Sequence, residues 1–572
     1  MYLQCSVDIP DVPGKITRKM KNNTVYIDFE YDRIYYPDRK YTIPRRVTIG
    51  KQLPDDPNRM TPNEIFLKYF PEVQLPAEKD TSLRSYSLKA GAFIVLREII
   101  NAYELPALLD KYFSPADLGL FLDLAIYSII CENNASQYYP DYAYNHLLFT
   151  RKMHMYSDSK IADFLNQVTD EQSMGFLNDW NAARDHREKI YISYDSTNKN
   201  CQAGDIELVE FGHPKTDMGL PIFNYAVAYD TSNQVPLFYE DYPGSIVDVS
   251  QLQYMLDRAY AYGYRKVGFI LDRGYFSREN IEYMDQYGYD FVIMVKGRAK
   301  LVNELIMAHR GSFEESWSRR VKAYDVSGIT VKHKLYESDR NPRYFHLFHS
   351  DEKQTGERTA LKVKLERMAA LMDRYKGKLV MVPENYNQYF DVLYDQDGIF
   401  LALKEKEEVI ERELKLCGYF VIVTSKKMTA EEAITLYKGR DVSEKLFRGS
   451  KSYLGSKSLR VHSNESATAK IFIEFVATII RNRMYTLLKA EMVNNNRKAN
   501  YMTVPAALRE LEKIEMTRMG DGKYRLSHAV TATQKAILKA FRLEAADIKN
   551  KTNQINEQLR GEQNGKRTKD TN

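Results

Sequence analysis

The chain has 572 residues, which is too many for one ordinary hydrophobic core, so several domains are expected. Hydrophobic residues make up 44% and charged residues 28%, a balance typical of soluble proteins, and the net charge of +5 suits an acidic partner such as nucleic acid without requiring one. The cysteines lie far apart with no C-x-x-C pair, which argues against a disulfide framework or a cysteine-based zinc site.

The most apolar stretches argue against a membrane protein. Leu118–Cys131 and Ile471–Ile480 are short, and they contain Asp123 and Glu474, so neither is expected to span a bilayer. The N-terminus lacks the charged-then-apolar layout of a signal peptide. We therefore expect an intracellular protein without a membrane partner.

Residues 1–80 predict a basic, β-rich module. Thr24–Tyr31 and Tyr41–Ile49 have the composition of strands, and Pro and Asp residues separate them. The basic residues of the module are Arg18, Lys19, Lys21, Arg39, Lys40, Arg45 and Arg46. Such a module could contact DNA or could simply be a solvated edge, and the pattern leaves both interpretations open.

The region 81–186 predicts helices. Apolar residues recur at helical spacing in Ala92–Tyr103, Leu118–Glu132 and Lys160–Val168. We expect this region to serve DNA binding or assembly.

From Lys189 the pattern becomes that of an α/β domain. The expected elements are strands at 189–197, 223–229, 234–239, 266–272 and 290–296, with helices at 248–262 and 277–287 between the last three. The continuous apolar runs among them are typical of buried central strands. This order predicts a mixed five-stranded sheet with helices on both faces.

An inserted subdomain, mainly β, is expected at 301–416. Its strand-like pieces are Ile329–Tyr336, Arg343–His349, Lys378–Val382 and Tyr389–Leu393, and charged helical stretches such as Leu361–Tyr375 separate them. The predicted regions are therefore 1–80, 81–186, 187–300 with 417–490 as the α/β core, 301–416, a helical 491–548 and a disordered tail at 549–572.

Two aspartates end strands of the predicted sheet. Asp195 follows directly on a strand in YDST, and Asp272 ends a buried strand in LDRGYF. Either residue alone would more often be a turn or cap residue. On neighbouring strands, however, their charges repel unless a cation lies between them, and the carboxyl ends of strands are where α/β sheets bind ligands. The pair therefore predicts a site for a hard metal ion.

The segment TAEEAITLYKGRDVSEKLFRGSK supplies a third carboxylate. Thr429 and Glu432 form a capping box that predicts a helix start. On one continuous helix, four polar residues would fall within about 60° of one another: Tyr437, Arg440, Glu444 and Lys451. A solvated, salt-bridging face is the alternative. Gly449 could end the helix and leave Lys451 on a loop.

These residues resemble a known signature. Tyr, two residues, Arg, three residues, Glu, six residues and Lys is similar to the pattern of DDE transposases of bacterial insertion sequences, in the insertion-sequence-four superfamily. YDST resembles the first Asp motif of that group, and LDRGYFS resembles the second. The long gap before Glu444 resembles the β-rich insertion of the group. The resemblance covers about residues 187–490.

The resemblance implies an RNase H-like fold and a DNA transposase in the bacterial cytoplasm at the nucleoid. It implies that Asp195, Asp272 and Glu444 are catalytic and bind two Mg²⁺ or Mn²⁺ ions, which activate the nucleophile and stabilise the leaving oxygen. Tyr437, Arg440 and Lys451 would hold DNA phosphates. The implied partners are double-stranded DNA, as element ends and target, and further copies of the chain in a homodimer or larger assembly; 87–181 and 491–545 are the expected contact surfaces.

Trp317 lies beside Arg319 and Arg320 in the predicted insertion. We hypothesise that it stacks on a displaced DNA base, although a buried core tryptophan is the commoner case.

Two alternative functions stay open. One is a metal-dependent DNA nuclease of the same fold that never joins strands, and inverted repeats beside the gene would argue against it. The other is an inactive, transposase-derived DNA-binding protein, against which the presence of all three carboxylates argues.

Overall fold

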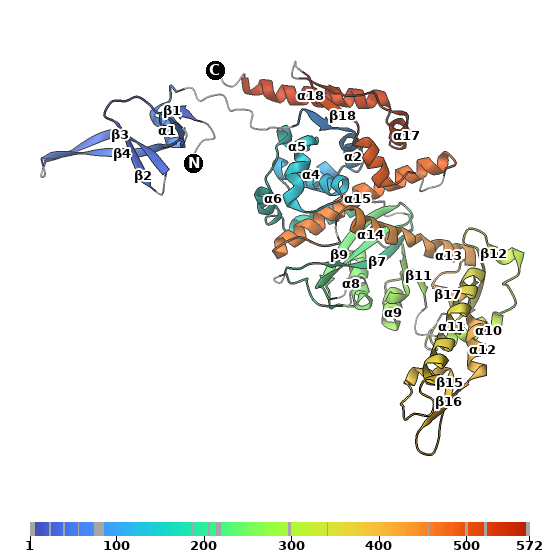
Figure 1. Ribbon diagram of the computed structural model, residues 1–572. Coiled ribbons are helices and arrows are strands. Elements are labelled where there is room, and N and C mark those ends of the chain that lie inside the picture. Colours follow the sequence, from blue (N-terminus) through green and yellow to red (C-terminus); the bar gives the residue numbers. More distant parts are fainter. Residues whose placement is uncertain are drawn as a thin grey trace. The chain divides into compact units, whose positions relative to one another are not determined.

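The computed structural model describes residues 6–21, 24–37, 40–54, 56–73, 85–185, 188–203, 206–212, 219–295, 299–339, 341–455, 457–497, 502–519 and 523–567; the side chains at 443, 444, 448, 450 and 559–567 lie outside this description. The chain divides into two compact units, Met1–Ser85 and Tyr86–Asn572, and each is described by itself (Figure 1).

The N-terminal unit is an antiparallel sheet in the order β1-β5-β4-β3-β2, followed by one short helix. Its elements are β1 (Val7–Asp8), β2 (Ile16–Lys21), β3 (Thr24–Tyr36), β4 (Tyr41–Gln52), β5 (Arg59–Pro62) and α1 (Glu64–Tyr69). Phe66 of α1 packs with Ile27 and Ile49 in a small core of its own. The two predicted strands are confirmed, and both are longer than predicted.

Nine strands form the central sheet of the larger unit, in the order β12-β13-β14-β17-β11-β10-β7-β8-β9. They are β7 (Ile190–Asn200), β8 (Ile222–Asp230), β9 (Val235–Pro243), β10 (Val267–Leu271), β11 (Asp290–Met294), β12 (Arg320–Val321), β13 (Val326–His333), β14 (Arg343–His349) and β17 (Tyr419–Thr424). β7, β10 and β11 run parallel, and every other neighbouring pair is antiparallel. The expectation of five strands is wrong, because β17 pairs with the outer edge of β11 and carries the sheet on into β14.

Helices cover both faces of this sheet, as predicted. Phe269 and Leu271 of β10 belong to the main core, which also contains residues of α8 (Asp248–Ala261) and α9 (Arg278–Gln286). Ile270, between them, belongs to a smaller core under α13 (Ala430–Gly439). Side chains alternate between the faces of a strand, so one strand serves two hydrophobic cores.

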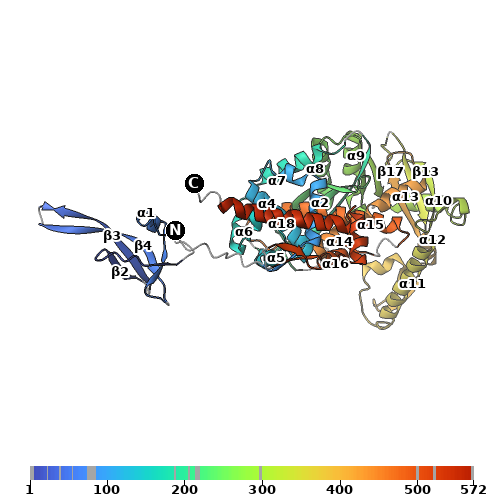
Figure 2. The same ribbon diagram turned by 90° about the horizontal axis from the view of Figure 1, so that it is seen from above.

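The N-terminal and C-terminal helical regions pack together around α15 (Asn464–Asn494). The other helices here are α2 (Gly91–Ala102), α3 (Leu105–Leu109), α4 (Pro115–Cys131), α5 (Tyr139–Asn145), α6 (Asp158–Leu165), α7 (Asp170–Ala182), α16 (Val504–Leu511), α17 (Ala532–Ala540) and α18 (Ala545–Arg567). α15 contacts α2, α4 and α16, and Figure 2 shows it running among them. A small sheet also joins the two regions, in which β18 (Glu515–Arg518) pairs with both β6 (Ser87–Lys89) and β19 (Tyr524–Leu526). No helix in the described part of the chain is both long and apolar enough to cross a membrane.

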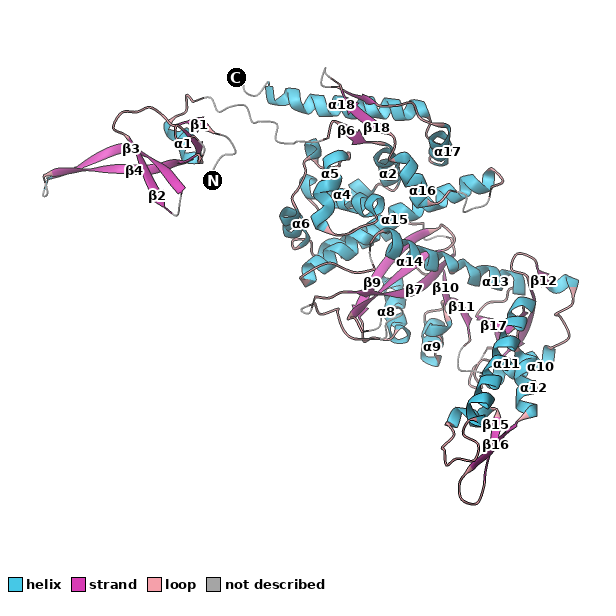
Figure 3. Cartoon of the chain, in the orientation of Figure 1, coloured by secondary structure: helices cyan, strands magenta, loops and turns pink. Residues whose placement is uncertain are grey.

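The segment predicted as a mainly β insertion is mixed. It contains the helices α10 (Ala299–His309), α11 (Asp351–Asp373) and α12 (Glu407–Leu416) beside a two-stranded sheet of β15 (Phe390–Tyr394) and β16 (Phe400–Glu405) (Figure 3). α11 forms because Ser350 caps it and because Met368 and Met372, one turn apart, pack into a local core. The protrusion from α11 to α12 leaves β14 at His349 and returns to β17 at Tyr419, and these two residues are register partners.

The tail predicted to be disordered from residue 549 is instead helical as far as Arg567. α18 contacts β19 and α2, and Ile548, Thr552 and Ile555 are buried on one helical face. The low apolar content of the tail hid this stripe, which is anchored by tertiary packing. Residues 568–572 lie outside the described residues.

His346 is buried in β14 between threonines of both neighbouring strands. Its Nδ1 lies 2.9 Å from Oγ1 of Thr330, and its Nε2 lies 3.0 Å from Oγ1 of Thr424. The Thr424 hydroxyl donates to the Lys426 carbonyl, so it accepts from Nε2–H, which is the arrangement of a neutral imidazole. Burial lowers the pKa of His346 to about 4.

Lowering the pH from about 6.5 to about 4 is expected to destabilise the larger unit. In the unfolded chain His346 takes up a proton at its ordinary pKa of 6.5, whereas in the folded chain it does so only near 4. The contribution of neutral His346 to the free energy of unfolding is therefore complete above pH 6.5 and is lost as the pH falls toward 4. The loss attributable to His346 is at most about 3 kcal/mol. Urea unfolding at pH 7.5 and pH 5 should detect about 2 kcal/mol of this loss. His346→Gln should show a shallower pH dependence than the parent chain; an identical dependence would contradict the assignment.

Candidate active site

Asp195 and Asp272 lie side by side at the end of β10. In the parallel pairing of β7 with β10, Tyr194 is the register partner of Leu271. The next residue along each strand is the aspartate. β7 does not end at Asp195, as the sequence predicts, but continues to Asn200, paired with β8 and bridged at Asn200 to Ser458. The prediction that the two aspartates lie on adjacent strands is confirmed.

The geometry of the strands directs both carboxylates to the face under α13. Ile270 of β10 contributes to the core beneath α13, and Asp272 follows it by two residues in extended backbone, with φ −71° and ψ 159°. Residues two apart in a strand share a face, and so do register partners. Asp195 therefore emerges on the same face as Asp272.

Arg440 lies over both carboxylates. Its Nη1 is 3.8 Å from Oδ2 of Asp195 and 3.7 Å from Oδ2 of Asp272. The two oxygens are therefore at most about 7.5 Å apart, within the range of about 10 Å in which one pair of metal ions could be shared. Burial disfavours the charge of Arg440, but Asp272 and Asp195 outweigh it and raise the pKa of the guanidinium.

Main-chain hydrogen bonds hold the other oxygen of each aspartate. Oδ1 of Asp195 accepts from the N–H of Ser196 at 2.9 Å, and Oδ1 of Asp272 accepts from the N–H of Arg273 at 2.8 Å. Asp272 also caps a short 3₁₀ helix, Arg273–Tyr275. With Oδ1 fixed in this way, each Oδ2 is held toward the guanidinium of Arg440.

The helix after β17 is divided in two. Its capping box of Thr429 and Glu432 is confirmed. The expectation of one continuous helix is wrong, because α13 ends at Gly439 and α14 (Asp441–Tyr453) follows, with Arg440 between them. Glycine is a poor helix former, so the interruption falls where the sequence is weakest.

Glu444 and Lys451 are both on α14, which packs against β7 and α15. The side chain of Glu444 lies outside the described residues, so the structure gives only its place on α14. Lys451 is helical, and the loop alternative is wrong. A Cβ at Gly449 would lie 2.6 Å from Nη1 of Arg481 on α15, so a larger residue there would require this long side chain to shift.

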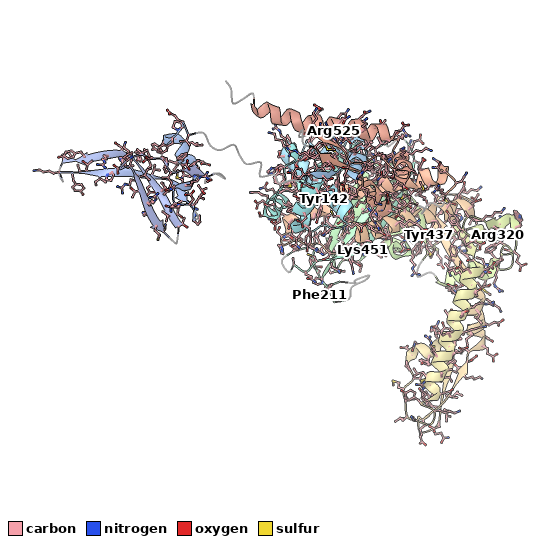
Figure 4. All side chains as sticks on the ribbon, turned by 45° about the horizontal axis from the view of Figure 1, so that its top comes forward. Tyr142, Phe211, Arg320, Tyr437, Lys451 and Arg525 are labelled. Carbon is pink, nitrogen blue, oxygen red and sulfur yellow. The ribbon has the colours of Figure 1, made fainter. Side chains whose placement is uncertain are left out.

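Tyr437 is buried one turn before Arg440. Its ring belongs to the core under α13, and the Arg440 guanidinium lies 5.6 Å from the ring centroid. Burial raises the pKa of Tyr437 to about 12; Arg440 acts against this increase, and Asp272 adds to it. In the view of Figure 4, Tyr437 and Lys451 lie apart along the α13–α14 segment.

Trp317 is 62% exposed, so the interpretation of a core tryptophan is wrong. It lines a polar hollow of about 1110 Å³ that also includes Arg320, and Nζ of Lys322 lies 4.5 Å from its ring centroid. Trp180, in contrast, is fully buried and donates to the carbonyl of Pro236.

A buried ion pair joins β7 and α15, and no sequence pattern predicted it. Lys199 lies on the strand of Asp195, and its ammonium donates to Glu474. Their side chains are 0% and 7% exposed, and Nζ of Lys199 also lies 4.1 Å from the ring centroid of Tyr225. The glutamate within the apolar run Ile471–Ile480 was the signal that a buried partner exists.

The two aspartates form an arrangement that suits a divalent cation. Two carboxylates face one positively charged group, and hard metal ions prefer such oxygen ligands. Among the side chains that the structure describes, no group of three or more His, Cys, Asp or Glu residues could hold a metal ion, and Glu444 is not one of those side chains.

Taken together, the mixed sheet and the two aspartates on its neighbouring strands define an α/β protein with a candidate cation site. The family model described as transposase DDE domain matches residues 195–480, half of the chain, beginning at Asp195 itself. The chain belongs to the transposase DDE domain family. This membership supports a DNA transposase, as the sequence predicts. No match was found among curated proteins.

Two solved transposase structures are similar to the chain. One is a cryo-EM structure of the piggyBac transposase synaptic complex with hairpin DNA, with 9% identity, a TM-score of 0.34, and coverage of 81% of this chain and 82% of that chain. The other is the Mos1 transposase paired-end complex with the left transposon end, with 14% identity, a TM-score of 0.14, and coverage of 30% and 57%.

Proposed function

We propose that the protein is an active DNA transposase of the insertion-sequence-four superfamily, which cleaves the ends of its element and joins them to target DNA. The observation that carries this proposal is that Asp195 and Asp272 both face the guanidinium of Arg440. Asp195 lies on β7, and α14 packs against this strand. α14 bears Glu444 at the spacing of the family signature.

We further propose an RNase H-like core made of β9, β8, β7, β10 and β11. This part of the sheet has three antiparallel strands followed by two parallel ones, and the chain orders them 3-2-1-4-5. The first and fourth strands carry the aspartates, which supports the assignment.

In this proposal Asp195, Asp272 and Glu444 hold two Mg²⁺ or Mn²⁺ ions. The ions would supply an activated nucleophile and charge stabilisation at the leaving oxygen. The main-chain hydrogen bonds to Asp195 and Asp272 pre-orient their carboxylates, so less freedom is lost when ligands bind. Tyr437, Arg440 and Lys451 would position the backbone phosphates at the cut, because fixed donors near the acidic pair align an anionic substrate. Two copies of the chain would hold two element ends.

One experiment tests the transposase activity and distinguishes it from a nuclease and from an inactive DNA-binding protein. The purified full chain is incubated with Mg²⁺ or Mn²⁺ and DNA that carries the element's own ends. Cleavage followed by joining to a second DNA is the expected result. Cleavage without joining would indicate a nuclease, and end binding without cleavage would indicate an inactive DNA-binding protein. Light scattering of the active complex should show more than one copy of the chain.

Arg440→Gln is expected to slow cleavage about a hundredfold while metal dependence persists. It removes a phosphate contact, a loss of roughly 3 kcal/mol for a charge-assisted hydrogen bond. It also removes a positive charge beside both aspartates, so Mn²⁺ should bind about tenfold more tightly, as measured by electron paramagnetic resonance. Lys438→Gln, an exposed cation two residues away, should change neither quantity. Unchanged cleavage and Mn²⁺ affinity in Arg440→Gln would contradict the assignment.

We also propose that Trp317 stacks on a displaced base. The exposed indole, with Lys322 over its ring and Arg320 in the same hollow, offers a stacking surface beside cations for phosphates. Trp317→Ala should lose most of the quenching of 2-aminopurine placed at the cleavage point, and Trp317→Phe should retain part of it. Equal quenching in all three proteins would exclude this role.

A further inference from the structure

β3 and β4 reach beyond the rest of the N-terminal sheet. β2 pairs with β3 only as far as Phe29, and β5 pairs with β4 only from Gly50 to Gln52. From Tyr31 to Tyr36 and from Tyr41 to Arg46, the strands that the structure describes pair only with each other. We name residues 31–37 and 40–46 the ribbon arm, and Figure 3 shows it projecting from its own unit as two bare strands.

The ribbon arm exposes large side chains that the small core of its unit does not use. Its large exposed residues include Tyr35, Tyr36, Tyr41 and Ile43, with Tyr35 at 59%. Tyr36 is the register partner of Tyr41, and Ile34 is that of Ile43, so these four share one face. An isolated two-stranded hairpin is only marginally stable, and large side chains that stay exposed to water add little to its stability. The face is therefore suited to an interaction.

The charge of the ribbon arm identifies the kind of partner. Its described residues include one acid, Asp32, and four bases, namely Arg33, Lys40, Arg45 and Arg46. At its base, Glu30 is buried and paired with Arg33 and Arg46, whose side chains remain 64% and 43% exposed. One carboxylate thus orients two guanidinium groups that still face solvent. The excess of positive charge favours a polyanion over an uncharged protein surface.

The dimensions fit duplex DNA. Six residues of antiparallel strand span about 20 Å, and the two strands lie about 5 Å apart. The major groove of B-DNA, about 12 Å wide, admits a two-stranded β-ribbon. We propose that the ribbon arm enters the major groove of double-stranded DNA. Arg33, Lys40 and Arg45 contact phosphates on its rims, and the face of Tyr36, Tyr41 and Ile43 meets base edges. This inference rests on the proposed function in taking DNA as the substrate.

Binding of the full chain to a duplex of element-end sequence tests the proposal, by fluorescence anisotropy over a series of salt concentrations. Lys40→Ala/Arg45→Ala should lower the affinity about tenfold and flatten the slope of log affinity against log salt by about 1.8, for two lost phosphate contacts. Tyr36→Ser/Tyr41→Ser should lower the affinity about tenfold with an unchanged slope, because these residues carry no charge. Lys19→Ala/Lys21→Ala is the matched control, since β2 places these exposed lysines near the other end of β3.

Four results would overturn the proposal. They are unchanged affinity in both arm variants, an equal loss in the control pair, a parent chain that binds no duplex, and loss of dimer instead of DNA binding, which would make a second copy of the chain the partner. Because binding is measured without metal, arm-dependent binding by a chain that never cuts would remove the catalytic proposal and leave this one standing.

Discussion

Glu444→Gln is expected to abolish cleavage and joining while leaving the binding of DNA ends largely intact. The substitution keeps the size and helix propensity of the side chain but removes a negative charge needed to hold metal ions. A loss of about 4 kcal/mol of transition-state stabilisation corresponds to a rate about a thousandfold lower. The measurement is cleavage of DNA carrying the element's ends in Mg²⁺ or Mn²⁺, with binding measured separately.

Asp441→Asn is the matched control for Glu444→Gln. It removes the same charge on the same helix, three residues earlier and outside the polar stripe, and should retain activity. If Glu444→Gln cuts as well as the parent while Asp441→Asn is inactive, the third carboxylate has been assigned to the wrong residue.

Lys199→Met is expected to lower the free energy of unfolding of the larger unit by about 3–5 kcal/mol. The substitution leaves Glu474 buried between α15 and β7 without its cation, and an uncompensated buried charge is strongly destabilising. Urea unfolding, followed by circular dichroism, measures the change.

The double variant Lys199→Met/Glu474→Met separates the charge effect from the loss of packing. It removes both charges and should recover most of the stability, because a well-packed apolar pair can replace a buried ion pair at little net loss. If the double variant is less stable than Lys199→Met by several kcal/mol, the ion pair does not account for the loss.

Local patterns predicted the parts of the candidate site that are local in sequence. Asp195 and Asp272 each follow an apolar run that is visible in the sequence and forms a strand, and parallel register then places them together. The capping box of Thr429 is likewise contained in four residues. For such features, hydrogen bonding and side-chain period act over a few residues, and single-sequence reasoning is sufficient.

Features that depend on distant contacts were not predictable in this way. Lys199 and Glu474 come into contact only when α15 packs on β7, and the sequence around either residue does not indicate which residue is its partner. The nine-stranded sheet has the same origin, because β17 finds the edge of β11 only after a long excursion of the chain. The position of Arg440 over both aspartates likewise appears only when the helix after β17 packs on the sheet that carries them.

The pairing of His349 with Tyr419 has a consequence for how this protein can change. The N–H of Ser350 donates to the carbonyl of Gly418, so everything between them is joined to the sheet at one closed neck. Closing a loop costs a free energy that grows only with the logarithm of its length. Residues 351–416 could therefore lengthen, shorten or be exchanged for another protrusion with little effect on the strands that carry Asp195 and Asp272. The length of this protrusion could then change in evolution without a change in the site formed by Asp195 and Asp272.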